Sequence, residues 1–367
     1  MIEICHITTV HSRYDVRIFH KECISLSPIY SVNLIVADGL GNETKNGIKI
    51  HDIGLRQNNR LKRAKTDSKK ALKKALELNC QLYHFHDPER IKVGLRLKKA
   101  KKKVIYDVHE DLPRQIYGKP YLNNLIKPLI SNFVEYIENY ISKKLDYIIT
   151  ATPFITERFQ KKINNTVDIR NYPLLNEIKS DFDFNKKENE ICYVGGISEY
   201  RGICELIESL NHSKIKLNLA GDFDSEYLEH KCKNSKGWKF VDYHGFVSRK
   251  EIAGILNKSK IGIVTLHPLV NYLDSLPVKM FEYMFAGIPV IASDFPLWIK
   301  IVNDNHCGIN VNPLDSNEIA SAVQELLSNP DKAEEMGKNG QKAVKEKYNW
   351  SIEEKKLLKV YKDILGE

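Results

Sequence analysis

The sequence lacks any apolar run long enough to cross a lipid bilayer. None of its 367 residues belongs to a stretch of roughly 18 consecutive apolar residues, which excludes an ordinary membrane-spanning helix. Residues 1–7 carry neither a basic leader nor a long apolar segment, so they indicate a first strand and not a signal peptide.

Cysteines are few and scattered. Seven occur, and none forms a C-x-x-C pair with another. This spacing argues against a structural zinc site and favours reduced thiols in a cytoplasm. The polar turn after the first strand also lacks the G-x-G-x-x-G of dinucleotide sites, which weakens a dehydrogenase interpretation.

The net charge of +9 is unevenly placed, because residues 56–103 hold 17 Lys and Arg against four acidic residues. A solvated helix face explains such a run. The alternative is attraction to anionic lipid headgroups, worth about 1 kcal/mol per basic residue near a membrane surface. No helix-turn-helix, zinc finger or aromatic RNA-binding pattern accompanies the charge, so we predict no nucleic-acid partner.

Short apolar runs alternate with helical patterns along the chain, which is typical of βαβ units and parallel sheets. A polar stretch at 176–190 interrupts this alternation, and we interpret it as a linker between two doubly wound α/β domains. Ligands of such sheets bind beyond the carboxyl ends of the strands, so a central cleft is expected between the domains. The first-half strands are predicted at 2–9, 31–37, 48–53, 82–85, 103–108, 146–150 and 167–170, with helices at 66–79 and 121–145. The second helix is expected to pack on the sheet, and a role at a membrane surface is its secondary interpretation.

The most informative stretch is residues 271–294, where a polar loop leads into a short helix from about Val278 to Phe285. The N-terminus of a helix attracts anions, and Lys279 adds a positive charge there. Glu282, one turn further in, can accept hydrogen bonds from sugar hydroxyls. The stretch therefore predicts a nucleotide-sugar site. Its donor-binding residues would be Asp274, Ser275, Leu276, Pro277, Lys279 and Glu282.

A second glycine-rich turn supports this site. The strand at 190–195 runs into Gly195-Gly196, and Arg201 opens the next helix with a fork for phosphate oxygens. The turn at Gly221 is predicted to pass near the phosphates, and Phe246 with Val247 to border the nucleobase. Plain structural turns explain these last two features almost as well.

In the first domain, polar residues follow strands that should end at the cleft. His109 and Glu110 follow one strand, and Asp87 follows another. An imidazole there can bind a sugar hydroxyl or stabilise charge during bond cleavage. Arg13, Asp15 and Arg17, after the first strand, line the acceptor side or cap a helix; with Asp87 and Glu110 they are the predicted acceptor-binding residues.

Two features of the sequence could bind a metal: a pair of histidines and two Asp-x-Asp triplets. His84 and His86 share a strand face, but zinc needs three or four converging ligands and the sequence names no further one. The triplets Asp181–Asp183 and Asp222–Asp224 resemble pairs that hold a metal on a diphosphate. Cationic side chains and helix ends can neutralise the diphosphate instead, so we predict no metal.

These residues resemble the retaining glycosyltransferases of family 4, the group 1 transferases, which have the GT-B fold. The resemblance is strongest at Pro277-x-Lys279-x-Phe281-Glu282 with Gly287-x-Pro289, and next at Gly195-Gly196 with Arg201-Gly202. The opening His11-Ser12-x-Tyr14-Asp15-x-Arg17 is similar to a subset acting in bacterial surface-polysaccharide assembly, such as that of O-antigen, lipopolysaccharide or capsule.

The resemblance implies sugar transfer with retained anomeric configuration, without an obligatory metal or cofactor. It implies that Glu282 binds the donor ribose, that Arg201 and Lys279 neutralise the diphosphate, and that His109 contacts the donor sugar; these four are the predicted catalytic residues. It also implies two Rossmann-like domains, 1–178 for the acceptor and 179–349 for the donor, with a C-terminal helix at about 350–367 crossing back to the first. The chain departs from the family at Asp274, where a Glu is common, and at Gly196, where an Arg is frequent.

The predicted function is thus a glycosyltransferase of class EC 2.4. Uridine diphosphate is the expected donor nucleotide and guanosine diphosphate its rival. The expected acceptor is a saccharide linked to polyprenyl diphosphate, reached by peripheral contact with the inner face of the cytoplasmic membrane. Two alternatives stay open: a nucleotide-sugar epimerase of similar layout, and a non-catalytic nucleotide-sugar-binding partner subunit.

Overall fold

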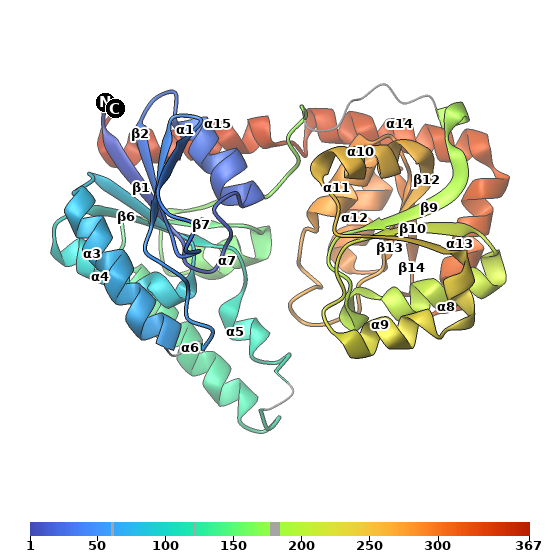
Figure 1. The fold of residues 1–367 in the computed structure, drawn as a ribbon, viewed down its shortest axis with the longest axis horizontal. Helices are drawn as coiled ribbons and strands as arrows, with labels where there is room; N and C mark the ends of the chain where they lie inside the picture. Colours follow the sequence, from blue (N-terminus) through green and yellow to red (C-terminus); the bar gives the residue numbers. More distant parts are fainter. Residues whose placement is uncertain (60–61, 120–121, 177–183) are drawn as a thin grey trace. The chain divides into compact units, whose positions relative to one another are not determined.

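The computed structural model describes residues 1–59, 62–119, 122–176 and 184–367 (Figure 1). The chain divides into two compact units. Unit 1 comprises residues 1–171 and 351–367, and unit 2 comprises residues 172–350. Residues 177–183 of the predicted linker, with the Asp181–Asp183 triplet, lie outside the described residues.

Unit 1 is built on a sheet with the strand order β3-β4-β2-β1-β5-β6-β7-β8. Neighbouring strands run parallel, apart from the antiparallel pair β3–β4. The strands are β1 (Glu3–Ile7), β2 (Ser31–Val36), β3 (Glu43–Lys45), β4 (Ile48–Asp52), β5 (Leu82–Phe85), β6 (Lys103–Val108), β7 (Tyr147–Thr150) and β8 (Thr166–Asp168).

The predicted strands of this unit are confirmed to within two residues at each end, but β3 was missed. It is short and joins β4 through Asn46 and Gly47, which have φ values of 52° and 76°. Asn-Gly is the preferred pair for a two-residue hairpin, because both positions require a positive φ. The Asn46-Gly47 dipeptide is the sequence feature that could have predicted this hairpin.

Helices cover both faces of the sheet in unit 1. One face of the sheet packs against α3, α4 and α7 in a hydrophobic core. The opposite face is covered by η1 and α15, and the hydroxyl of Tyr361 in α15 lies 3.0 Å from Nε2 of His6 in β1. The helical segments are η1 (Val16–Cys23), α1 (Ile24–Leu26), η2 (Arg63–Asp67), α3 (Ser68–Leu78), η3 (Pro88–Arg90), α4 (Ile91–Lys99), α5 (Leu112–Gln115), α6 (Lys127–Ser142), α7 (Pro153–Gln160) and α15 (Trp350–Leu365).

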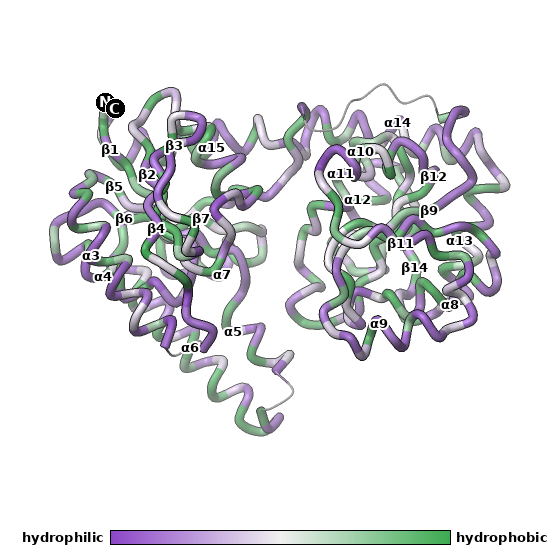
Figure 2. Tube along the Cα trace, in the orientation of Figure 1, coloured by the Kyte–Doolittle hydropathy of each residue, from purple (hydrophilic) through white to green (hydrophobic). Residues whose placement is uncertain are grey.

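Helix α6 corrects one expectation, because its apolar stripe does not pack on the sheet. Leu129 is 70% exposed and Phe133 62% exposed. The face toward the protein is instead mostly polar: buried Glu138 accepts hydrogen bonds from the Tyr106 hydroxyl and from Arg158. This bonded carboxylate sets the rotation of the helix, so its apolar residues, which alternate with polar ones in Figure 2, point outward.

Unit 2 has a parallel sheet of order β11-β10-β9-β12-β13-β14, with a separate hydrophobic core on each face. Helices α8, α9 and α13 pack on one face, and α10, α11, α12 and α14 on the other. The strands are β9 (Glu188–Val194), β10 (Lys216–Ala220), β11 (Val241–Gly245), β12 (Ser259–Val264), β13 (Val290–Ser293) and β14 (Gly308–Val311). The helical segments are η4 (Phe184–Lys186), η5 (Glu199–Arg201), α8 (Ile203–Ser213), α9 (Glu226–Lys233), η6 (Lys236–Phe240), α10 (Arg249–Lys258), α11 (Val278–Phe285), α12 (Pro296–Asp304), α13 (Ser316–Ser328) and α14 (Pro330–Glu346).

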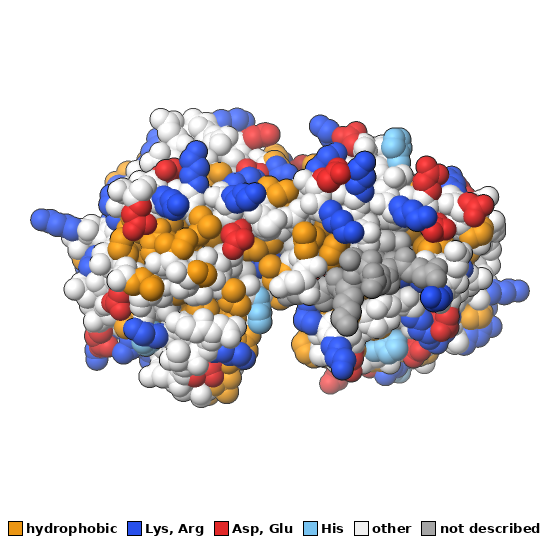
Figure 3. Space-filling view, turned by 90° about the horizontal axis from the view of Figure 1, so that it is seen from above, with side chains coloured by type: hydrophobic (Ala, Val, Ile, Leu, Met, Phe, Trp, Pro, Cys, Tyr) orange, Lys and Arg blue, Asp and Glu red, His pale blue; other side chains and the backbone are white. Residues whose placement is uncertain are grey.

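On the face drawn in Figure 3, the charged side chains of the described residues do not form one large patch of a single sign. Among the described residues of that face, Lys and Arg side chains are interspersed with Asp and Glu. Of the described helices, none combines the length and the apolarity that a membrane crossing requires.

Candidate functional site

The turn after β9 brings two cations of unit 2 together. Gly195 has a φ of 125°, a region that favours glycine. A Cβ built on Gly195 would lie 3.1 Å from Lys279 Nζ and 4.0 Å from Arg201 Nη1. Arg201 Nη1 also donates a 3.1 Å hydrogen bond to Gly196 O. The structure thus gathers these four predicted donor-binding residues at one turn, and the missing side chain of Gly195 leaves room for the end of the Lys279 side chain.

Gly221 supports this turn from the neighbouring strand. Its φ is 139°, and a Cβ built on it would lie 2.1 Å from Gly195 O. The backbone of the two turns can approach this closely only because residue 221 is a glycine. The role of Gly221 in this geometry is to hold the shape of the Gly195 turn.

Lys279 presents a buried ammonium group that has no hydrogen-bond partner. Its Nζ is buried without a polar contact, and it lies 3.6 Å from the centre of the Tyr193 ring. Burial, and then the charge of Arg201, lower the pKa of Lys279 well below its usual range, while Glu282 acts in the opposite direction. A buried unpaired charge is costly. An anion bound at the turn would supply the missing partner.

The start of α11 adds a second feature that favours an anion. Lys279 is the second residue of this helix, and Pro277 precedes it without a side-chain cap. The first backbone N–H groups of a helix have no partner within it, and its dipole places partial positive charge there. The helix end and the two cations therefore suit a phosphate or diphosphate.

Glu282 is held by a residue that the sequence analysis missed. Its carboxylate is buried, and Oε1 lies 2.8 Å from Arg249 Nη2. Arg249 is the first residue of α10, whose start is fixed by a capping box between Ser248 and Glu251. The sequence feature that could have indicated Arg249 is its place directly after a predicted helix cap, beyond the carboxyl end of β11. The pair fixes the orientation of the carboxylate that we predict to bind ribose.

The remaining predicted donor residues lie in loops of unit 2. Phe246 is 83% exposed, whereas Val247 and Leu276 pack on the same core as α11. Ser275 is engaged within its loop, since its hydroxyl donates to Tyr272 O at 2.8 Å. Asp274 and Pro277 are half-buried.

Asp107 links several of the predicted residues in unit 1. It ends β6, is fully buried, and accepts two 2.9 Å hydrogen bonds from Arg17. His109 Nε2 lies 3.0 Å from Asp107 Oδ2. Asp107 was not among the predicted residues. A carboxylate within an otherwise apolar strand is the sequence feature that could have indicated it. Arg17 is buried in this ion pair, so it positions Asp107 and offers little surface to an acceptor.

His11 joins two further predicted acceptor residues. Its Nδ1 lies 3.3 Å from Asp15, and its Nε2 lies 3.8 Å from Asp87. The imidazole rings of His11 and His109 are 5.1 Å apart between centres. The structure therefore brings His109, Asp15 and Asp87 together around His11, at the carboxyl ends of neighbouring strands.

Arg13 and Glu110 differ from this group. Arg13 is almost buried and forms two hydrogen bonds, of 2.7 and 2.6 Å, with Asp38. It holds the loop that contains Asp38 instead of extending into solvent. Glu110 is exposed and accepts a hydrogen bond from Gln115.

Residues 176–343 match the family described as Glycosyl transferases group 1. The matched residues include the Gly195 turn, Arg201, Arg249 and the whole of α11. The Gly195 turn and the start of α11 therefore lie inside the matched region.

Curated relatives match the chain mainly over the same region. An uncharacterised glycosyltransferase of Methanocaldococcus jannaschii is 28% identical over 180 residues, covering 48% of this chain and 45% of the relative. An alpha-1,4-N-acetyl-D-galactosaminyltransferase of Campylobacter jejuni, named for a saccharide on PP-undecaprenol, is 23% identical and covers 60% of each chain. The chain spans about half the length of the curated relatives it matches.

A solved structure matches nearly the whole chain. Alr3699/HepE of Anabaena in complex with UDP-glucose aligns with a TM-score of 0.73 at 15% identity, covering 99% of this chain and 100% of that one. This likeness shows the fold. The predicted fold class, the two-domain α/β GT-B fold, is confirmed.

Proposed function

We propose that this protein is a retaining glycosyltransferase of family 4 that moves a sugar from a nucleotide-sugar donor to a saccharide acceptor. One observation carries the proposal. The buried Lys279 ammonium, at the start of α11, has no hydrogen-bond partner, and it lies beside Arg201 and the Gly195 turn. A diphosphate supplies the negative charge that this arrangement lacks.

The chemistry follows from where charge develops. As the bond between the sugar and the diphosphate breaks, negative charge grows on the leaving phosphate. Lys279, Arg201 and the first N–H groups of α11 stabilise that charge more strongly than they stabilise the intact donor, which lowers the barrier. The acceptor hydroxyl attacks from the same face and loses its proton to the departing phosphate. These cations provide the neutralisation, so the proposal requires no metal ion at the diphosphate and no cofactor.

The nucleoside is assigned to the neighbouring residues of unit 2. Glu282, oriented by Arg249, accepts hydrogen bonds from the ribose hydroxyls, and the loop at Phe246 and Val247 borders the base. A structural neighbour holds UDP-glucose, which supports uridine diphosphate as the first candidate and leaves guanosine diphosphate as the second.

The residues around His11 in unit 1 are assigned to the transferred sugar and the acceptor. We assign His109 to the donor sugar, because Asp107 fixes its ring. Asp15, Asp87 and Glu110 are acceptors of hydrogen bonds and suit sugar hydroxyls. Arg13 and Arg17 act indirectly, since their guanidinium groups hold Asp38 and Asp107.

We further propose that the acceptor is lipid-linked and belongs to bacterial surface-polysaccharide synthesis. We also propose that α6 contacts the anionic membrane surface that holds this acceptor. A relative is named for a saccharide on PP-undecaprenol. The exposed apolar face of α6 is continued by the exposed Lys143 and Lys144, and α6 lies on the sheet face that also carries the lysine-rich α3 and α4. Apolar side chains with flanking lysines fit an interfacial helix.

Replacing Leu129 with aspartate tests this contact. We expect binding to vesicles containing anionic phospholipid to weaken by about 10-fold, because one apolar anchor is lost and one negative charge is added. Sedimentation with the vesicles at two salt concentrations measures it, and high salt should also release the wild type. Leu40→Asp is the matched control, since Leu40 is 73% exposed and Leu129 is 70% exposed in the same unit. Equal binding by the two variants would contradict the contact.

A panel of nucleoside diphosphates and nucleotide sugars tests the function itself. We expect one base to raise the melting temperature and its sugar to be hydrolysed slowly without an acceptor. Thermal shift followed by chromatography of the sugar products measures both. Interconversion of two nucleotide sugars without an acceptor would favour an epimerase. Binding without any turnover, with and without lipid-linked saccharides, would favour a non-catalytic subunit.

A further inference from the structure

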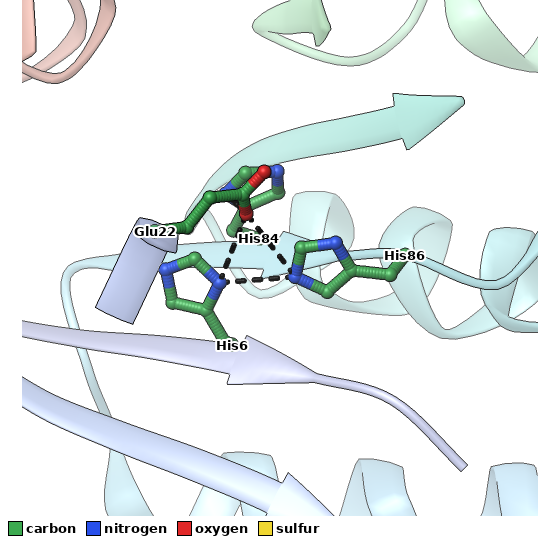
Figure 4. Close-up of side chains that lie close together, drawn as sticks. All are labelled: His6, Glu22, His84 and His86. Carbon is green, nitrogen blue, oxygen red and sulfur yellow. Dashed lines mark hydrogen bonds and ion pairs between the residues drawn. The ribbon is translucent and has the colours of Figure 1, made fainter. Parts of the chain in front are cut away.

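Four buried side chains of unit 1 meet at a point that the proposed reaction does not use. They are His6 of β1, His84 and His86 of β5, and Glu22 of η1 (Figure 4). All four are essentially inaccessible to solvent. One nitrogen or oxygen from each lies within 4.8 Å of every other. Three imidazoles and a carboxylate are a ligand set that suits a first-row divalent metal such as Zn²⁺.

The fold explains why they converge. Strands β1 and β5 are parallel neighbours, and His6 is paired with His84 in their register. Because successive side chains alternate between faces, His84 and His86 point to the same side of the sheet. Segment η1 covers that side and brings in Glu22; it is a π-helix, a form often found at functional sites. The sequence alone showed the pair on β5 but not the two residues that join it.

The centre of the cluster is electrostatically incomplete. Glu22 Oε2 accepts no hydrogen bond, although it lies 3.8 Å from both His6 Nδ1 and His86 Nε2. Two buried carboxylates, Glu22 and Asp107, share one guanidinium, that of Arg17, an arrangement that a further cation would complete.

The outer nitrogens of His6 and His86 already have the partners that metal-bound histidines require, whereas His84 contacts the Tyr361 hydroxyl through Nδ1, the nitrogen that lies 4.0 Å from Glu22. His6 Nε2 lies 3.0 Å from the Tyr361 hydroxyl, and His86 Nδ1 lies 3.3 Å from Asp107 Oδ2. A metal-bound histidine almost always donates its other N–H to an oxygen of this kind, which fixes the ring and its tautomer. The inner nitrogens, His6 Nδ1 and His86 Nε2, are 3.0 Å apart and turn toward Glu22.

We propose that His6, Glu22, His84 and His86 bind one divalent metal ion, with Zn²⁺ as the best fit. Four protein ligands and complete burial make this a closed, structural site. The ion would join β1, β5 and η1, and through Tyr361 it would also fix α15, the last helix of the chain. It replaces the proton shared between His6 and His86 and adds the cation that the two carboxylates lack. The ligands are distinct from the diphosphate-binding residues of unit 2, but His86 Nδ1 lies 3.2 Å from His109 Nε2, so zinc content and not activity tests this proposal.

Metal content tests the proposal directly. Protein without a histidine tag, produced in zinc-supplemented medium and dialysed, should hold about one Zn²⁺ per chain by elemental analysis. Removal of zinc with a chelator should lower the melting temperature, and added zinc should restore it. Cobalt loaded into the emptied protein should show the visible absorption of a tetrahedral site. A wild-type protein with no bound zinc and no cobalt spectrum would overturn the proposal, and this result does not depend on any variant.

Two variants separate this site from adventitious binding. Glu22→Gln keeps the side-chain volume but removes the charged ligand, so zinc per chain should fall at least about 10-fold. Tyr361→Phe removes the hydroxyl that contacts both His6 Nε2 and His84 Nδ1, so zinc affinity should fall by about 10- to 100-fold. His212→Gln, at an exposed histidine of α8, is the control and should bind zinc normally. Unchanged zinc content in Glu22→Gln would place the ion elsewhere and overturn the assignment.

Discussion

Replacing Lys279 with methionine is expected to lower kcat by about 100-fold or more, which is the scale of removing one preorganised charge partner of a transition state. The same change should not lower the free energy of unfolding. Lys279 Nζ is buried without a hydrogen bond, so an apolar side chain of similar length removes an unpaired charge. Steady-state kinetics with the identified donor, together with chemical denaturation, measure the two quantities.

This combination separates catalysis from folding. Lys300→Met, at an exposed lysine of α12, is the matched control and should leave both quantities unchanged. Arg201→Ala should also reduce kcat on the same scale, because Arg201 shares the turn at Gly195 with Lys279. A Lys279→Met protein with nearly normal turnover would remove this residue from the mechanism and would require another source of positive charge.

Replacing Gly221 with alanine is expected to destabilise unit 2 by about 2 to 4 kcal/mol and to abolish donor binding. The new Cβ would lie 2.1 Å from Gly195 O, so one of the two turns must move, and the φ of 139° adds strain. Movement of the Gly195 turn separates the backbone from Arg201 and Lys279. Chemical denaturation and nucleotide titration measure the two effects.

Gly254→Ala is the control and should act in the opposite direction. Gly254 lies inside α10, and a Cβ built there meets nothing within 4 Å. Alanine is a better helix former, so the variant should gain about 0.5 to 1 kcal/mol and bind the donor normally. Similar losses in both glycine variants would show that the close approach at Gly221 has no special importance.

The sequence was a good guide where local patterns decide the structure. The helix Val278–Phe285 begins and ends at the predicted residues, because a polar loop, a glycine and a proline enclose it. Helix α6 shows the limit of this reasoning. Its residues at 125, 129, 133 and 137 repeat every four positions, yet the buried ion pair of Glu138 turns that stripe outward. Periodicity shows that a helix has an apolar face and does not show what the face contacts.

The candidate site was predictable in its charged residues but not in their partners. Lys279, Arg201 and Glu282 follow from local motifs, whereas Arg249 reaches Glu282 only through tertiary packing. Asp107 was hidden within an apolar strand, although it holds both Arg17 and His109. Likewise, Glu22 joins the histidines only because η1 covers one face of the sheet. Such pairings depend on the order of the strands in the sheet, which local sequence patterns do not predict.

Helix α15 has a consequence for the way the protein is made. Unit 1 includes residues 351–367, which are translated after the whole of unit 2. On the ribosome, the part of the sheet face that α15 covers must therefore stay exposed while residues 172–350 emerge. Chaperone binding to nascent chains should persist until Tyr361 leaves the exit tunnel, and a chain stalled before that point should be sensitive to proteases in its first half.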